Sequence, residues 1–277
     1  MAIITFWNEQ KKQTGKTMST VAIATYMAIE HNARTLIVST DSNQEKLQRC
    51  FWKEEKKKKI NFGIFGPNTR TLDAEIGMKG LDRIIKSNKI TPEIITDYTR
   101  VVFKDRLEIL LGTGSVNPEL AQRYPDVIAA ANKYYDRILV DLDYCVPEET
   151  RKIILDMSDV VILNLAQGLS DIEKFRQKKE QKTDALIQSP KTLLLVGDYD
   201  KDSKYNYKNI TRYLKERNQV LTVPYNTLFF EASEEGMVAD LFLQFAKYSN
   251  SNKEDQNTFF IEEVKRATDN IVYRLVN

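Results

Sequence analysis

Short apolar runs rich in β-branched residues recur along the chain and alternate with segments of helical periodicity. Most of these runs are continuously apolar, which is typical of strands buried on both faces of a parallel sheet. The predicted strands are Ile3–Trp7, Thr35–Ser39, Leu107–Leu111, Arg137–Leu142, Val160–Leu165, Thr192–Val196 and Val220–Val223. The predicted helices are Lys16–His31, Leu81–Lys86, Asp126–Tyr134, Glu148–Met157, Asp171–Lys182 and Asn209–Glu216. This alternation predicts an α/β fold with a doubly wound, mostly parallel sheet and helices on both faces.

Polar stretches mark the limits of the predicted domain. The sequence predicts a single domain over residues 1–248, a linker over 249–257 and a C-terminal helix over 258–277. Within the domain, the polar segment Asp198–Tyr207 is expected to be a loop. One face of the final helix would carry the apolar residues Phe260, Val264, Ala267, Ile271 and Leu275. We therefore expect this helix to pack on the domain or on a partner.

The charge and the scarcity of histidine and cysteine narrow the classes of function. With 41 basic and 39 acidic residues, the chain of 277 residues is not a globally basic nucleic-acid-binding protein. Its single histidine, His31, nearly excludes sites that need several imidazole groups. Cys50 and Cys145 have no zinc-site or disulfide spacing, so we expect both to be reduced and the protein to be cytoplasmic. We also expect no transmembrane segment and no signal peptide, because no apolar run approaches the ~20 residues of a membrane span.

Candidate chemistry lies at the junction between the first predicted strand and the first predicted helix. There the loop between strand and helix contains Thr14-Gly15-Lys16-Thr17, and a helix with apolar periodicity follows. This arrangement is typical of a phosphate-binding loop, in which backbone N–H groups and the helix N-terminus surround a phosphate. Lys16 would reach the β- and γ-phosphates, and the Thr17 hydroxyl would bind Mg²⁺. The complete pattern needs glycine where the chain has Gln10, so an ordinary helix start with a basic flank stays the alternative.

This loop resembles that of the ParA/MinD family of deviant Walker A ATPases. The family loop reads Lys-Gly-Gly-x-Gly-Lys-Thr, and this chain reads Lys-Lys-Gln-Thr-Gly-Lys-Thr. The resemblance implies that Lys11 is the signature lysine and that Lys16 is the phosphate lysine. It also implies that ATP is bound by Lys12, Gln13, Thr14, Gly15, Lys16, Thr17 and Met18. Lys12 and Gln13 replace two glycines of the family loop, a departure that bears on hydrolysis more than on the fold.

Later segments are similar to those of the family in the same order, over about residues 2–247. In the segment similar to the second strand, the resemblance implies that Asp41 positions the attacking water, while Ser39 replaces a first aspartate. In the segment similar to the Walker B strand, Asp141 would hold Mg²⁺ through water. Pro224, Tyr225 and Asn226 are similar to the Pro-x-Asp segment near the base, with Asn226 in place of the aspartate. A structural alternative is that Asp41 simply caps the helix that follows.

The resemblance implies an ATP-dependent switch. Two subunits would form a homodimer around the nucleotides, with Lys11 crossing to the partner's phosphates. The dimer, with weak ATP hydrolysis, would position or segregate a cargo through a protein partner or cargo adaptor. The cargo would be a plasmid, a chromosome locus or a secretion or pilus machine. The alternative is a degenerate nucleotide-binding scaffold with little or no hydrolysis that recruits a pilus or conjugation complex, as in the TadZ/CpaE-like branch.

Two further kinds of contact stay open. Non-specific DNA binding needs clustered basic residues, and the candidates are Lys53–Lys59, Lys174–Lys179 and Lys201–Arg217. We favour ordinary solvated faces, because Glu173 and Glu180 flank Lys174–Lys179 and Glu216 lies within Lys201–Arg217. Membrane attachment by the last helix is disfavoured, because its polar face mixes acidic and basic residues.

Overall fold

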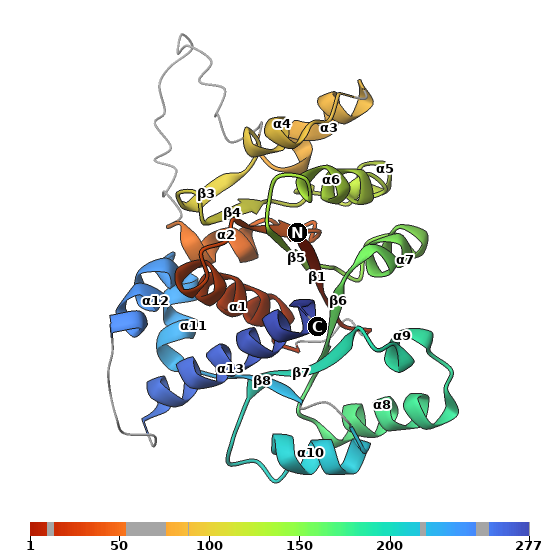
Figure 1. Ribbon diagram of the computed structural model, residues 1–277, viewed down its shortest axis with the longest axis vertical. Coiled ribbons are helices and arrows are strands. Elements are labelled where there is room, and N and C mark those ends of the chain that lie inside the picture. Colours follow the sequence, from red (N-terminus) through yellow and green to blue (C-terminus); the bar gives the residue numbers. More distant parts are fainter. Residues whose placement is uncertain (10–13, 54–75, 88, 217–219, 248–254, 277) are drawn as a thin grey trace, which may run out of the picture.

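The computed structural model describes residues 1–9, 14–53, 76–87, 89–216, 220–247 and 255–276. Within these residues an eight-stranded sheet runs through the molecule, in the order β3-β4-β2-β5-β1-β6-β7-β8 (Figure 1). Neighbouring strands are parallel, apart from the antiparallel pair β3 and β4. The strands are β1 (Ala2–Trp7), β2 (Thr35–Ser39), β3 (Arg100–Phe103), β4 (Leu107–Leu110), β5 (Arg137–Asp141), β6 (Val160–Leu165), β7 (Thr192–Tyr199) and β8 (Leu221–Pro224). The predicted fold class is confirmed.

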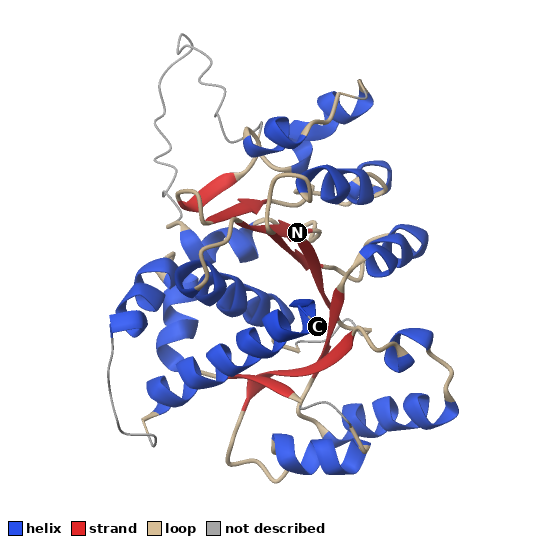
Figure 2. Ribbon diagram, viewed as in Figure 1, coloured by secondary structure: helices blue, strands red, loops and turns tan. Residues whose placement is uncertain are grey.

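Helices cover both faces of the sheet (Figure 2). On one face lie α1 (Lys16–Glu30), α2 (Glu45–Phe51), α11 (Thr227–Glu235), α12 (Val238–Lys247) and α13 (Gln256–Val276). On the other lie α3 (Met78–Lys86), α4 (Pro92–Thr96), α5 (Pro118–Ala121), α6 (Tyr124–Ala131), α7 (Glu148–Met157), α8 (Leu169–Gln181), α9 (Ala185–Gln188) and α10 (Tyr207–Leu214). In β1, Ile4 and Phe6 join the first core, whereas Ile3 and Trp7 join the second. The strands read as continuous apolar runs because both of their faces are buried.

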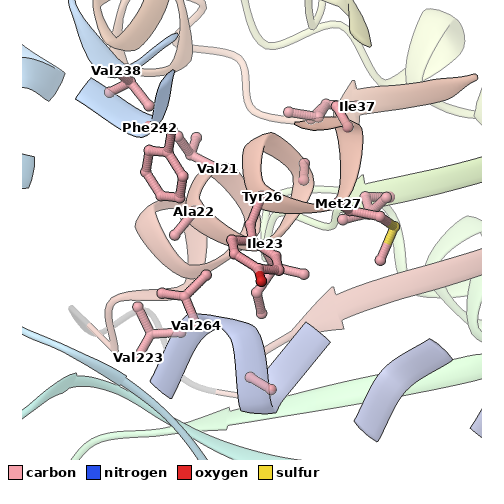
Figure 3. Packing of buried hydrophobic residues seen from close by; sticks show 14 of the residues in the cluster. Val21, Ala22, Ile23, Tyr26, Met27, Ile37, Val223, Val238, Phe242 and Val264 are labelled. Atoms are coloured by element: carbon pink, nitrogen blue, oxygen red, sulfur yellow. The ribbon is translucent and has the colours of Figure 1, made fainter. Parts of the chain in front are cut away.

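Helix α1 lies at the centre of the first core. Figure 3 shows its side chains surrounded by residues of the sheet and of two other helices. The labelled residues are Val21, Ala22, Ile23, Tyr26 and Met27 of α1, with Ile37, Val223, Val238, Phe242 and Val264 around them. All residues from Ser19 to Ala28 of this helix are buried, so packing holds it in a fixed position. Its first residues, Lys16 and Thr17, are therefore fixed relative to the ends of the strands.

Helix α13 packs within this chain, alongside α1 and β8 (Figure 1). Its buried residues include Phe260, Val264, Ala267 and Ile271. Arg266 pairs with Glu263, and both contact the Thr222 hydroxyl on β8. The helix begins at Gln256, two residues before its predicted start, because Asp255 accepts a hydrogen bond from the Thr258 N–H at 2.8 Å. Residues 249–254 of the predicted linker lie outside the described residues.

The sequence analysis missed β3 and ended β7 too early. β3 is a four-residue edge strand with partly exposed side chains, so it lacks a continuous apolar run. β7 continues to Tyr199, which pairs with Pro224 on β8. The first two residues of the expected loop Asp198–Tyr207 therefore belong to a strand, and its last residue begins α10. In the described part of the chain, no helix has both the length and the apolar character needed to cross a membrane.

Candidate nucleotide-binding site

A glycine in a left-handed conformation joins β1 to α1. Gly15 is the N-cap of α1, with φ 65° and ψ 10°. A Cβ atom at this position would lie 2.9 Å from the Asp198 nitrogen and 2.9 Å from the Gly197 Cα. Glycine is therefore required both by the dihedral angle and by the close approach to the end of β7. The predicted loop residues Lys11, Lys12 and Gln13 lie outside the described residues.

The structure brings Lys16, Thr17 and Asp141 together. The Lys16 ammonium pairs with the Asp141 carboxylate and donates to the Leu142 carbonyl at 2.7 Å. The Thr17 hydroxyl donates to Asp141 Oδ2 at 2.9 Å. The contact arises because β1 and β5 are parallel neighbours, so that the start of α1 lies beside the carboxyl end of β5. Asp141 is 1% exposed, and this burial makes the contacts from Lys16 and Thr17 essential for its charge.

This donor set fits a nucleotide with Mg²⁺. Lys16 supplies the cation that phosphate oxygens need, and Thr17 and Asp141 supply the hydroxyl and carboxylate oxygens that Mg²⁺ prefers. Among the described residues, no group of three or more histidine, cysteine or acidic side chains forms a metal cage.

Two further carboxylates, those of Asp143 and Asp41, lie near Asp141. Asp143 follows β5, and its N–H donates to the Thr40 hydroxyl at 2.7 Å. Asp41 follows β2, and one of its carboxylate oxygens accepts from the Asn43 N–H at 2.8 Å. Burial raises the pKa of Asp41, and the charges of Asp143 and Asp141 raise it further, while the Asn43 hydrogen bond and Lys16 oppose the shift. Asp143 was not predicted as a site residue, although it stands two positions after Asp141.

These groups open onto a cleft of ≈ 690 Å³. Ligand pockets in proteins typically measure about 300–1,000 Å³, so the cleft has room for a nucleotide. Its lining includes the predicted residues Thr14, Gly15, Lys16, Thr17, Met18, Asp41, Pro224, Tyr225 and Asn226. Asp141 lies behind Lys16 and Thr17 and is reached through them.

One wall of the cleft was missed by the sequence analysis. It comes from α2 and from α11, neither of which was predicted. The residues concerned are Lys46 and Cys50 of α2, with Phe229, Phe230, Ser233 and Glu234 of α11. A signal for α11 was present in the sequence, because an asparagine precedes it and a glycine, Gly236, follows it.

Asn226 lines the cleft, but its amide group is engaged in the fold. The side-chain oxygen accepts from the Phe229 N–H at 2.9 Å, which caps the N-terminus of α11. The side-chain nitrogen donates to the Asn257 side-chain oxygen at 2.8 Å, in the first turn of α13. Asn226 is 3% exposed. It therefore joins three elements at the base-side end predicted for the cleft.

The loop after β5 is held by a stack of two rings and a guanidinium. The rings of Trp7 and Tyr144 are nearly parallel, with centroids 6.4 Å apart. Arg151 of α7 lies 4.9 Å from the Trp7 centroid and 5.7 Å from the Tyr144 centroid, and it donates to the Tyr144 and Val146 carbonyls at 3.4 Å. These contacts tie the loop that carries Asp143 to the strand that precedes the phosphate loop.

Comparison with known proteins supports the fold at low sequence identity. No family model matches the chain, and no curated protein matches its sequence. A ParA family ATPase from Chlorobium tepidum has a TM-score of 0.65 at 14% identity, over 96% of this chain and 98% of that chain. MinD from Pyrococcus horikoshii, complexed with Mg-ADP, has a TM-score of 0.60 at 17% identity, over 98% of this chain and 97% of that chain.

A third structure is described as a putative plasmid partition protein from Borrelia burgdorferi bound to AMPPNP. It has a TM-score of 0.57 at 16% identity, over 99% of this chain and 98% of that chain. The identities are too low to carry residue roles from one chain to another. The predicted resemblance is confirmed in architecture, and the chain has the fold of the ParA/MinD P-loop ATPases.

Proposed function

We propose that the protein binds MgATP and acts as a dimerising nucleotide switch of the ParA/MinD type. The observation that carries this proposal is the convergence of Lys16, Thr17 and Asp141 at the start of a buried helix, beside a nucleotide-sized cleft. Structures with the same fold have been solved with Mg-ADP and with AMPPNP, which supports a nucleotide as the ligand class.

In this proposal, Lys16 and Thr17 exchange their contacts with Asp141 for contacts with the nucleotide and its metal ion. Lys16 now neutralises Asp141, and an entering triphosphate would compete for the same ammonium group. Asp141 would hold Mg²⁺ through water, and the ion would supply the positive charge that Lys16 now supplies beside this carboxylate. The Thr17 hydroxyl would turn from Asp141 to the ion. The backbone of residues 12–18 would surround the phosphates.

Hydrolysis would depend on Asp41. We propose that its carboxylate orients the attacking water at the γ-phosphate. Burial and two neighbouring carboxylates raise its pKa, and a raised pKa makes a carboxylate a better proton acceptor near neutral pH. Lys11 of one subunit would reach the phosphates in the other, so that ATP would favour the dimer. The dimer would act on a cargo through a protein partner or adaptor.

The location and the DNA contact are further parts of the proposal. We propose a cytoplasmic protein, since Cys50 and Cys145 form no disulfide with each other or with another described residue. Non-specific DNA binding by the dimer would use Lys174–Lys179 and Lys201–Arg217. Of the third basic cluster, Lys53–Lys59, all but Lys53 lies outside the described residues.

A degenerate scaffold is the second candidate, and Ser39 favours it. Ser39 stands where the family has a first aspartate, and its hydroxyl accepts from the Asp41 N–H at 3.3 Å. The site thus lacks one carboxylate near the γ-phosphate. In this reading ATP binds without turnover, and the bound form recruits a pilus or conjugation complex, as in the TadZ/CpaE-like branch.

Phosphate release from MgATP by the purified protein separates the two candidates. The variant is Lys16→Ala, and the matched control is Lys174→Ala, which removes an exposed lysine of α8. Turnover that is lost in the first variant and kept in the second supports a working switch. Binding without turnover in the wild-type protein supports the scaffold. Absence of both binding and turnover would contradict nucleotide binding itself.

A further inference from the structure

We propose that Lys46 of α2 is a second cation for the phosphates of the nucleotide, placed on the wall of the cleft that α2 and α11 form. This inference rests on the proposed function and adds a phosphate contact that the sequence did not suggest. A nucleotide brings an anionic polyphosphate into a cleft whose described lining is itself mostly acidic among its charged groups.

The charged side chains in the described lining of the cleft are unevenly divided between the two signs. The carboxylates are those of Asp41, Asp143, Asp198 and Glu234, and the ammonium groups are those of Lys16 and Lys46. Lys16 already neutralises the Asp141 carboxylate that lies behind it. MgATP keeps a negative charge even with its Mg²⁺, so a further cation in the lining would favour its entry. Within the described lining, Lys46 is the basic side chain that is left for this role.

Helix α2 presents Lys46 to the cleft. Lys46 and Cys50 both line the cleft and stand four residues apart, so they lie on one face of the helix. Leu47 and Phe51 of the same helix are buried in the first core. Packing therefore fixes the backbone from which the Lys46 side chain extends.

Asp198 relates Lys46 to the phosphate loop. A Cβ atom on Gly15 would lie 2.9 Å from the Asp198 nitrogen, so the end of β7 touches the start of α1. Partial desolvation raises the pKa of Asp198, and the positive charge of Lys46 lowers it. Lys46 thus lies within electrostatic range of a residue that touches the loop. The flexible four-carbon stem of lysine would let its ammonium group turn toward a phosphate held beside Gly15 and Lys16.

The two lysines differ in the contacts that they would give up. Lys16 has to leave Asp141, whereas Lys46 is exposed and makes no ion pair with another residue in the described part of the chain. Phosphate binding by Lys46 therefore breaks no contact of the fold and costs mainly the freedom of one long side chain. Because an exposed ammonium is hydrated and screened by salt, its contribution to affinity should be smaller than that of Lys16.

The test measures the binding of MgATP and of magnesium tripolyphosphate, which has no base, by titration calorimetry. The proteins are the wild type, Lys46→Ala, Lys46→Arg and the control Lys79→Ala, which removes an exposed lysine of α3 outside the described lining of the cleft. We expect Lys46→Ala to weaken both ligands about tenfold, because a charge-assisted hydrogen bond to phosphate is lost. Lys46→Arg keeps the charge and should bind both ligands within about threefold of wild type. Lys79→Ala should bind both like wild type.

Several results would overturn the inference. Equal binding by Lys46→Ala and the wild type would show that Lys46 does not contact the phosphates. A loss for MgATP alone, with tripolyphosphate unchanged, would place Lys46 at the nucleoside instead. An equal loss in Lys79→Ala would assign the effect to net charge, and an equal loss in Lys46→Arg would assign it to the shape of the side chain. In each of these cases the wild-type protein still binds MgATP, so the proposed function survives. If neither ligand binds to the wild-type protein, the proposed function fails together with this inference.

Discussion

The two ends of the cleft are built in different ways. At the proposed phosphate end, Asp141 comes from the central strand β5 and Lys16 and Thr17 from the start of the largely buried α1, and their polar groups satisfy one another. At the proposed base end, the Asn226 side chain caps α11, and the exposed rings of Tyr225 and Phe230 form the surface. The first end is specific and charged, whereas the second is largely apolar. Affinity should therefore depend mainly on the first end.

The largest effect is expected at the phosphate end, for Lys16→Ala. This change removes the proposed phosphate cation and leaves Asp141, which is 1% exposed, without its ion-pair partner. Nucleotide affinity should fall about a hundredfold, because charged hydrogen bonds to phosphate are lost. The free energy of unfolding should fall by about 3 kcal/mol, because a buried charge is uncompensated. Titration calorimetry and denaturant unfolding measure the two effects.

A double variant separates the two roles of Lys16. In Lys16→Met with Asp141→Leu, the buried charge is gone together with its partner, so stability should recover while nucleotide binding stays lost. If the double variant binds nucleotide like wild type, the phosphate end has been placed wrongly.

Gly15→Ala tests the close approach between the phosphate loop and β7. The added Cβ would lie 2.9 Å from backbone atoms of β7, at a φ of 65°. We expect a loss of about 2 kcal/mol in the free energy of unfolding, together with weaker nucleotide binding. Gly168→Ala is the matched control, since its φ is −91° and its Cβ would meet only a side-chain oxygen at 3.4 Å. Equal stability of the two variants would show that the loop is free to move away from β7.

Asn226→Ala tests whether the base end is tied to the fold through this side chain. Loss of the α11 cap should lower the free energy of unfolding by about 1 kcal/mol, with a further small loss from the bond to Asn257. Asn206→Ala is the control, because Asn206 caps α10 in the same manner, with 3.1 Å between its side-chain oxygen and the Asn209 nitrogen. Both should be destabilised in urea unfolding, and neither should lose as much nucleotide affinity as Lys16→Ala. An unchanged free energy of unfolding in Asn226→Ala would show that this side chain does not tie the base end to the fold.

The smallest effect is the pH dependence contributed by Asp41. Its pKa in the folded protein is raised above the ordinary 3.8, mainly by burial. The folded state therefore holds the proton more tightly than the unfolded state, and this contribution to stability is present below 3.8 and is lost as the pH rises through the raised pKa. Relative to Asp41→Asn, the wild-type protein should lose stability over that window. If the difference in stability between the two proteins does not change with pH over this window, the pKa of Asp41 is not raised in the folded protein.

The grouping of Lys16, Thr17 and Asp141 was predictable from the sequence, and the contacts that tie Asn226 to the fold were not. Gly15-Lys16-Thr17 is recognisable because it opens an apolar helix after the first strand, and Asp141 because it ends an apolar strand; parallel strands bring their carboxyl ends together. The role of Asn226 was hidden, because its partner Asn257 lies 31 positions away at the start of α13. Contacts of that kind depend on tertiary packing, which sequence periodicity does not specify.

Edges and short elements escaped prediction for a related reason. β3 has partly exposed side chains, and α2 is seven residues long, so neither carries a strong apolar pattern. The wall of the cleft formed by α2 and α11 was missed with them. Arg151, by contrast, lies on the correctly bounded α7, but its position against Trp7 and Tyr144 follows from how that helix packs.

A crystal structure of the protein with Mg²⁺ and AMPPNP would test the account most directly. We expect the phosphates at Lys16 and Thr17, the Lys16–Asp141 pair opened, and Mg²⁺ between Thr17 and the phosphates. A nucleotide bound elsewhere, or one bound here with Lys16 still paired to Asp141, would contradict the proposed site.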